Sequence, residues 1–396
     1  MNILVATPVL YDKNSPFNHL FKDILEGFLS DGNSITRIVA IETDDDLGFT
    51  LGIDNTNIYY KKVKRKKSNK NNIIMRYIYD NLANINMAWK ILRIKSIDVL
   101  FEDISYSSFW SVLAAKIKKV KIISMIQDVW PDNAVGSGIL TNKSLLYWYF
   151  EIWQRLVYKL SDHLICISED IKEFIIQKGI GKEKITVIFN WGYSDELVDI
   201  PWDKNKFVKK FNLDSNIFYA VYAGNIGKMQ NVEVVVNIAQ KLINNEKIHF
   251  LIIGDGVKKN DIAKIIQNEK ITNVTMLPMQ PSEFATSIYS MASVNLIPLV
   301  KGGVKTALPS KTGICLSCGQ PILLCLDKSS EYAKMIEQSK SGVAVDFDDA
   351  DGAVQVIEGM LNSRIKIEKQ NVWACFNTNF LQSVNVTKYR KIVGSI

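Results

Sequence analysis

The chain contains little cysteine, little histidine and no long hydrophobic run. Its five cysteines in 396 residues are an odd and scattered set, which argues against a disulfide framework and favours a reducing compartment. Only Cys315 and Cys318 lie close together in the sequence, and the three histidines are far from them. Zinc is therefore not expected, and both cysteines are predicted to lie in the core of a helix.

A secretion signal and a transmembrane helix are also missing from the pattern. Residues Met1–Ala6 favour a strand, because no basic segment or cleavage site surrounds them. No stretch reaches the roughly eighteen apolar residues that a membrane-spanning helix needs. A cytoplasmic protein is expected.

The net charge of +7 is concentrated rather than spread, since much of it falls between Lys61 and Lys70. No nucleic-acid recognition motif accompanies this basic run, so nucleic acid is not an expected partner. A solvated loop is the first interpretation of the run.

Apolar strand patterns alternate with helical patterns along most of the chain. This alternation predicts an α/β fold with parallel, doubly wound sheets. The alternation is interrupted by a polar stretch, Pro201–Asn216, after which a second series begins. We therefore predict two tandem Rossmann-like domains facing across a cleft: residues 1–195, with a helix at about 375–396 returning to them, and residues 196–374.

The second series contains the same unit twice. One apolar run ends in Gly224–Gly227 and the next ends in Gly254–Gly256, and a helical pattern follows each. A parallel strand that ends in glycines before a helix presents backbone N–H groups at the carboxyl edge of the sheet. The pattern predicts a diphosphate-binding site.

Four stretches, in this order, resemble family 4 retaining glycosyltransferases of GT-B fold, in the fucosaminyltransferase-like branch of bacterial O-antigen and capsule synthesis. The resemblance lies in Ile126–Asp132, Val187–Trp191, Tyr222–Gly227 and Leu308–Ile322. It implies retaining, metal-independent transfer of a sugar from a UDP-sugar to a polyprenyl-diphosphate-linked glycan. An N-acetylated hexosamine or deoxyhexosamine is the sugar it implies, with no cofactor besides the donor.

The same resemblance suggests which residues act. Charge on the leaving diphosphate has to be neutralised, and Lys311, which opens a helix after Ser310, is the best candidate cation. Gln127 and Asp128 are the other catalytic candidates. The expected nucleotide-sugar ligands are Gly224, Asn225, Gly227, Lys228, Gln230, Gly254, Asp255, Gly256, Met279, Ser310 and Lys311, and the expected acceptor ligands are Asp132 and Asn190.

The chain also departs from the family pattern. Asn225 and Gln230 stand where many members have Arg and Lys, and Thr306 and Ile314 stand where many have a Glu-x7-Glu pair. A non-catalytic partner subunit of another transferase therefore remains an alternative. A UDP-sugar 2-epimerase is a third possibility, although the scarcity of histidine is unfavourable to it.

The basic run is followed by an apolar, aromatic helical pattern from Ile73 to Leu92, and a second aromatic segment spans Leu145–Trp153. Each is explained either by packing within the protein or by contact with an anionic membrane surface. The second interpretation predicts a peripheral protein at the inner face of the cell membrane. Asp44–Asp46 is expected to be a solvated acidic turn and not a metal site.

Overall fold

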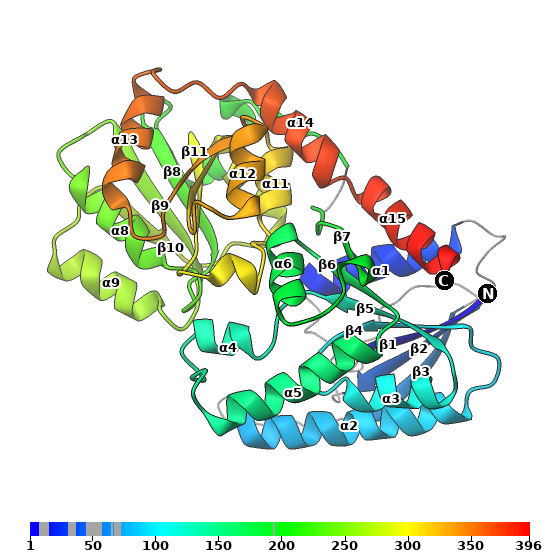
Figure 1. Cartoon of the computed structure of the whole chain (residues 1–396). Helices are drawn as coiled ribbons and strands as arrows, with labels where there is room; N and C mark the ends of the chain where they lie inside the picture. Colours follow the sequence, from blue (N-terminus) through cyan, green and yellow to red (C-terminus); the bar gives the residue numbers. More distant parts are fainter. Residues whose placement is uncertain (8–15, 31–36, 45–57, 65, 67–72, 193–194) are drawn as a thin grey trace. The chain divides into compact units, whose positions relative to one another are not determined.

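A computed structural model describes residues 1–7, 16–30, 37–44, 58–64, 66, 73–192 and 195–396. The chain divides into two compact units (Figure 1). Unit 1 comprises residues 1–135, 139–189 and 383–396, and unit 2 comprises residues 136–138 and 190–382. Apart from residues 136–138, the chain changes units after residues 189 and 382, and the sequence predicts these two changes at about 195 and 375.

Unit 1 is built on a seven-stranded sheet in the order β3-β2-β1-β4-β5-β6-β7. Every neighbouring pair is parallel, as the alternation of strands and helices predicts. The strands are β1 (Asn2–Thr7), β2 (Arg37–Asp44), β3 (Ile58–Lys64), β4 (Val99–Asp103), β5 (Lys121–Ile126), β6 (His163–Cys166) and β7 (Ile185–Val187).

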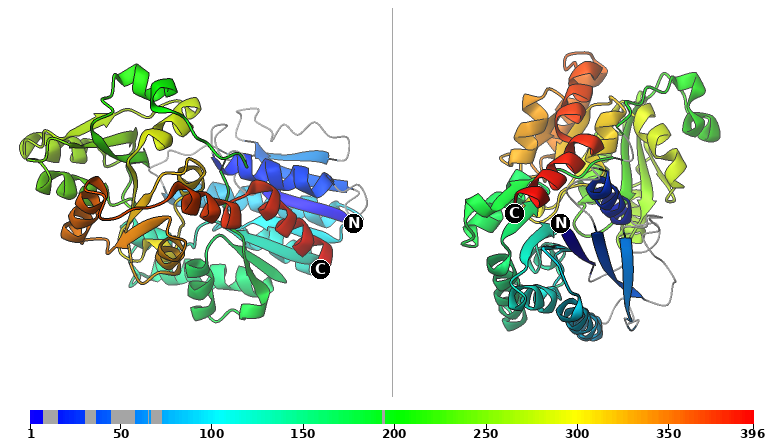
Figure 2. Two further views of the ribbon diagram at one scale, coloured as in Figure 1. Left: turned by 90° about the horizontal axis from the view of Figure 1, so that it is seen from above. Right: turned by 90° about the vertical axis from the view of Figure 1, so that its right-hand side faces the viewer.

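Helices cover both faces of this sheet, as expected for parallel strands (Figures 1 and 2). Successive side chains of a strand point to opposite faces. Phe101 of β4 therefore packs against Phe28 of α1 and Tyr389 of α15, whereas Glu102 meets Ser111 of α3. The helices are α1 (Pro16–Leu29), α2 (Ile73–Arg93), α3 (Phe109–Ile117), α4 (Asp132–Gly136), α5 (Leu145–Leu160), α6 (Glu169–Gln177) and α15 (Gln382–Ser395).

The C-terminal segment joins unit 1, as the sequence predicts. Tyr389 and Val393 of α15 are fully buried, and the Tyr389 hydroxyl lies 3.2 Å from the Met125 sulfur. The Asn385 amide donates to the carbonyl of Phe189. This helix completes the core of unit 1.

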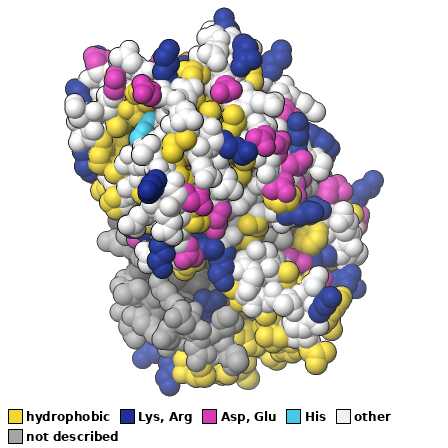
Figure 3. Space-filling model, turned by 90° about the vertical axis from the view of Figure 1, so that its left-hand side faces the viewer, with side chains coloured by type: hydrophobic (Ala, Val, Ile, Leu, Met, Phe, Trp, Pro, Cys, Tyr) yellow, Lys and Arg dark blue, Asp and Glu magenta, His cyan; other side chains and the backbone are white. Residues whose placement is uncertain are grey.

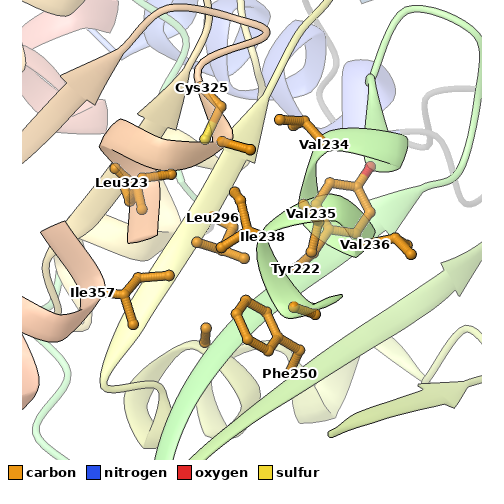
Figure 4. Packing of buried hydrophobic residues seen from close by; sticks show 14 of the residues in the cluster. Tyr222, Val234, Val235, Val236, Ile238, Phe250, Leu296, Leu323, Cys325 and Ile357 are labelled. Atoms are coloured by element: carbon orange, nitrogen blue, oxygen red, sulfur yellow. The ribbon is translucent and has the colours of Figure 1, made fainter. Parts of the chain in front are cut away.

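Unit 2 has a six-stranded parallel sheet in the order β10-β9-β8-β11-β12-β13. One face packs against α8, α9 and α13 in a continuous hydrophobic core that includes Tyr222, Val235 and Phe250 (Figure 4). The strands are β8 (Phe218–Asn225), β9 (Ile248–Asp255), β10 (Val274–Leu277), β11 (Val294–Pro298), β12 (Ile322–Cys325) and β13 (Gly342–Val345). The helices are α7 (Lys206–Phe211), α8 (Val232–Lys241), α9 (Lys259–Asn268), α10 (Ala285–Met291), α11 (Thr312–Ser317), α12 (Glu331–Gln338), α13 (Ala350–Leu361) and α14 (Lys369–Asn379).

The first half of the basic run is not the solvated loop that we predicted. Residues Lys61–Lys64 belong to β3 at the edge of the sheet, where lysines discourage pairing with another strand. Arg65 and Lys67–Lys70 lie outside the described residues, as do Asp45 and Asp46 of the acidic turn. Asp44 is the last residue of β2.

The five cysteines are free and buried, and Cys315 and Cys318 lie in and directly after α11, as the sequence predicts. Among the described residues, no three His, Cys, Asp or Glu side chains are grouped to hold a metal ion. None of the helices that the structure describes has the length and apolar character to cross a bilayer.

Candidate functional site

The order of strands in unit 2 identifies where a ligand would bind. The chain runs outward from β8 to β9 and β10, then returns to place β11 on the other side of β8. The loops that follow β8 and β11 diverge at this point, and ligands of open α/β sheets bind at such switch points, beyond the carboxyl ends of the strands. The two loops are connected by the Val300 N–H, which donates to the Met229 carbonyl at 3.0 Å.

Glycines allow the ends of β8 and β9 to pack backbone against backbone. Gly224 pairs with Gly254 in the sheet, and a Cβ on Gly254 would lie 1.8 Å from the Gly224 carbonyl oxygen. Gly256 has φ +154° and would place a Cβ 2.4 Å from the Ile226 oxygen. The Ile226 N–H already donates to the Asp255 carbonyl at 2.8 Å. It is therefore not available to a diphosphate, although it lies within the predicted donor loop Gly224–Gly227.

Lys311 is the cation at this switch point. Its Nζ lies 3.9 Å from the centre of the Tyr222 ring and 3.1 Å from the position of a Cβ on Gly224. Its side chain is half-buried, and this desolvation lowers the Lys311 pKa to about 8. Because α11 has only six residues, the lysine charge and not the helix end is the main positive feature.

The other residues predicted to bind the nucleotide differ in their exposure and in their hydrogen bonds. Asn225 is exposed, and its amide nitrogen is 3.4 Å from the Gln230 side-chain oxygen. The Asp255 carboxylate turns back to accept from the Gly256 N–H at 2.8 Å. Three further predicted ligands are exposed and make no side-chain hydrogen bond in the part of the chain that the structure describes: Lys228, Met279 and Ser310.

The two positions that hold carboxylates in many family members are uncharged and buried here. The Thr306 hydroxyl donates to the Gly303 carbonyl at 3.1 Å, and Ile314 is buried. Neither residue offers a base or an anion. Lys311 is therefore not neutralised from these positions.

In unit 1, Gln127 and Asp128 directly follow β5, at the carboxyl edge of the sheet. Gln127 is half-buried, whereas the Asp128 side chain is exposed. Desolvation by the surrounding protein raises the Asp128 pKa to about 6. Solvent access to the carboxylate limits what this shift contributes to stability.

Asp132 is less suited to the predicted acceptor role. One of its oxygens is 2.7 Å from Lys178 Nζ, and the other accepts from the Tyr147 hydroxyl at 2.9 Å. Lys178 also contacts Glu151 at 2.8 Å, so a buried ion-pair network occupies both oxygens of Asp132. Asn190, the second predicted acceptor ligand, is the first residue of the long segment of unit 2 and not part of unit 1.

The switch point of unit 1 lies between β1 and β4, and β4 carries the fully buried Glu102. The Ser111 hydroxyl oxygen is 2.7 and 2.8 Å from the two Glu102 oxygens and 2.8 Å from the Ser108 carbonyl. The Ser111 hydroxyl is thus within donating distance of both oxygens of Glu102. Burial raises the Glu102 pKa to about 8, which agrees with a neutral acid at pH 7.

Sequence analysis did not single out Tyr222 as a functional residue, because it belongs to an apolar strand pattern. Only the packing of Lys311 against its ring distinguishes Tyr222 from any other core aromatic. No spacing in the sequence connects positions 222 and 311.

Two parallel sheets with this strand order define the GT-B class of fold. The solved structure of Anabaena Alr3699/HepE in complex with UDP has a TM-score of 0.76, covers 100% of both chains and is 11% identical to this one. Residues 49–191 match the family model described as Glycosyltransferase Family 4, and residues 203–374 match the one described as Glycosyl transferases group 1. The chain belongs to the GT-B glycosyltransferases, which confirms the family that its sequence resembles. The fucosaminyltransferase-like branch stays a prediction.

Curated relatives are more similar in sequence than HepE is. The probable glycosyltransferase WbjE of Pseudomonas aeruginosa is 24% identical over 225 residues, which are 56% of this chain and 55% of WbjE. The O-antigen biosynthesis glycosyltransferase WclY of Escherichia coli is 22% identical over 284 residues, 70% of this chain and 73% of WclY. The match thus spans little more than half the length of WbjE.

Proposed function

We propose that the protein is a retaining glycosyltransferase that moves a sugar from a UDP-sugar to a lipid-linked glycan. The observation that carries this proposal is Lys311, a half-buried cation beside Gly224 at the switch point of unit 2. A nucleoside diphosphate matches such a site, because its charge suits the lysine and its phosphates suit a glycine-lined strand end. HepE, which shares the fold, was solved with UDP.

In the reaction, the bond from the sugar's anomeric carbon to the diphosphate breaks and a bond to an acceptor hydroxyl oxygen forms. Negative charge grows on the leaving diphosphate, and Lys311 stabilises it from a fixed position. The acceptor proton passes to the leaving phosphate, so no strong protein base is needed. Gln127 and Asp128, at the end of β5, orient the acceptor and the transferred sugar.

The proposed substrates come from the family resemblance and from the relatives. WclY is named for O-antigen biosynthesis, which supports a role in bacterial surface polysaccharide assembly, O-antigen or capsule. An N-acetylated hexosamine or deoxyhexosamine is the proposed sugar, and a polyprenyl-diphosphate-linked glycan is the proposed acceptor. We propose that transfer needs no divalent metal, since Lys311 supplies the positive charge at the diphosphate.

A lipid-linked acceptor requires access to the membrane. Unit 1 has a surface that we propose contacts the inner face of the cell membrane. Lys61, Lys64 and Lys66 are exposed, and each contributes about 1 kcal/mol near an anionic bilayer before screening. The apolar surface is formed by the exposed side chains of α2 and α5, which are Ile78, Leu82, Trp89, Leu92, Leu145, Leu146, Trp148, Tyr149 and Ile152.

The two helices present this apolar surface together. Tyr77 of α2 and Tyr149 of α5 have their hydroxyls 3.1 Å apart, and the rings of Tyr77 and Phe150 are in contact. Hydrophobic side chains gather at the lower edge of the molecule in Figure 3, where α2 and α5 lie. Met87 and Ile91 on the other face of α2 are buried in the core, so packing within the protein explains that face, and the exposed face is the one that we propose meets the membrane.

The histidines support a transferase over a 2-epimerase. His163 lies 3.0 Å from the Thr186 hydroxyl and His249 lies 2.8 Å from the Thr275 hydroxyl, while His19 faces Asp23. Each histidine thus contacts a side chain of its own unit, whereas a 2-epimerase would need histidines for acid and base catalysis. A non-catalytic partner subunit would keep the fold without turnover.

The test is UDP release from a panel of UDP-sugars in the presence of a lipid-linked glycan extract and EDTA. We expect release that depends on the extract and is abolished or strongly reduced in Lys311→Met. Binding of UDP without release from any donor would favour the partner subunit. Activity that is lost in EDTA and restored by Mn²⁺ would contradict metal independence.

A further inference from the structure

The charge of Lys311 is not opposed by a carboxylate. Lys178, whose side chain is buried, differs in this respect, because it lies between the carboxylates of Asp132 and Glu151. No ion pair involves Lys311 within the described ranges of the chain, and the nearest recorded partner of its Nζ is the Tyr222 ring. A desolvated cation that lacks a counter-charge is costly unless something else stabilises it.

The Tyr222 ring is held rigidly under that cation. Tyr222 is fully buried in β8 and belongs to the hydrophobic core with Val234 and Val235 (Figure 4). Its hydroxyl donates to the Asn225 carbonyl, which fixes the ring at its other end. The ring face is therefore a fixed surface at the carboxyl end of β8.

Gly224 keeps the space above the ring open. A Cβ there would lie 3.1 Å from Lys311 Nζ and 3.5 Å from its Cε. The φ of +147° at Gly224 is also one that side chains disfavour. The position of Lys311 is thus determined by a ring on one side and by a missing side chain on the other.

A ring and a carboxylate stabilise a lysine in different ways. A carboxylate cancels the charge, whereas an aromatic face attracts the cation through its quadrupole and carries no net charge. The full charge of Lys311 therefore remains available to an anionic ligand. This is what a site for a diphosphate requires.

We propose that Tyr222 is a positioning residue that holds Lys311 against its ring so that the lysine meets the diphosphate of the sugar donor. The proposal rests on the proposed function, because it assigns how the donor site of that function is built. Tyr222 does not touch the donor and acts only through Lys311.

A double-mutant cycle tests this with UDP as the probe. Calorimetric titrations compare the wild type, Tyr222→Met, Lys311→Met and the double variant. Lys311→Met should weaken UDP binding by about tenfold or more. Tyr222→Met, which fills similar volume without a ring, should weaken it about threefold or more in the wild type and have little effect once Lys311 is replaced.

Two controls separate positioning from general damage to the fold. Phe250→Met removes another fully buried aromatic of the same core, on β9, without touching Lys311, and should leave UDP affinity unchanged. Tyr222→Phe retains the ring, so its coupling to Lys311 should persist although the hydrogen bond to Asn225 is lost. Thermal unfolding confirms that each variant is folded.

The outcomes are distinguishable. Equal loss from Tyr222→Met in both backgrounds, or equal loss in Tyr222→Phe and Tyr222→Met, would overturn the role of the ring. If Tyr222→Met does not fold, Tyr222→Leu replaces it in the cycle. Losses of UDP affinity from Tyr222→Leu and Lys311→Met that simply add in the double variant would then overturn the role of the ring. A wild type that binds no nucleoside diphosphate would overturn the proposed function as well.

Discussion

At the scale of single residues, Lys311 connects desolvation to ligand binding. Its pKa is lowered to about 8, so raising the pH through 8 removes the charge from the free protein. A diphosphate binds the charged form, and the affinity for UDP should therefore fall as the pH rises from 7 to 10. Lys311→Arg, which stays charged, should lose this dependence, as should Lys311→Met at lower affinity.

Titrations of UDP between pH 7 and pH 10 measure this effect as the difference between the wild type and Lys311→Arg, because the uracil of UDP also loses a proton toward pH 10 and does so for both proteins. An identical pH profile in the wild type and in Lys311→Arg would show that another group titrates.

Glu102 is a second residue whose burial has a measurable consequence. Its pKa is raised from 4.5 to about 8, so the folded state binds a proton that the unfolded state releases. The free energy of unfolding should fall as the pH rises from about 4.5 to 8, by roughly 1.4 kcal/mol for each unit of pKa difference. Glu102→Gln keeps a donor toward Ser111 without a charge.

Denaturant unfolding at pH 6 and pH 9 tests this prediction. Glu102→Gln should be close to the wild type at pH 6 and more stable than it at pH 9. A variant that is destabilised equally at both pH values would mean that Glu102 is ionised in the folded protein.

At the scale of elements, α2 and α5 carry the proposed contact with the membrane. Leu145 is 89% exposed and Trp89 is 58% exposed, and burying such side chains contributes about 1.5–3 kcal/mol each. The triple variant Leu82→Ser, Trp89→Ser, Leu145→Ser should therefore bind anionic vesicles much more weakly. Leu197→Ser, at an exposed leucine of unit 2, is the matched control.

Co-sedimentation at low and high salt separates the two contributions to this binding. Replacing Lys62, Lys64, Arg65, Lys66 and Lys67 with Gln should remove the salt-sensitive part and leave the apolar part. Equal sedimentation of all variants would mean that neither surface meets the bilayer.

The elements that build the proposed donor site were predictable because local patterns encode them. Gly224–Gly227 and Gly254–Gly256 follow apolar runs, and both runs are strands of the predicted kind. β3 was not predicted, because its lysines obscure the alternation that an edge strand shows. The pairing of Lys311 with Tyr222 and of Asp132 with Lys178 depends on contacts between residues far apart in the chain, which no local pattern contains.

At the scale of the whole molecule, the two units should respond separately to changes. Removing residues 383–396 takes Tyr389 and Val393 from the core of unit 1, which should cost several kcal/mol, at about 1.5–3 kcal/mol for each buried side chain. UDP should raise the melting temperature of unit 2 by mass action. Scanning calorimetry of the truncated protein should show an earlier transition that does not respond to UDP.

A truncation that lowers the UDP-responsive transition instead would contradict this division of the chain. The full-length protein with Tyr389→Ala is a milder comparison, and it should affect the same transition as the truncation.

The account depends most on a nucleotide site at the switch point of unit 2. Hydrogen–deuterium exchange with and without saturating UDP locates that site directly in the intact protein. We expect slower exchange in peptides that cover Gly224–Gly227, Gly254–Gly256 and Pro309–Lys311, and little change in the strands of unit 1. Protection confined to unit 1, or no protection by UDP or any other nucleoside diphosphate, would contradict the central claim.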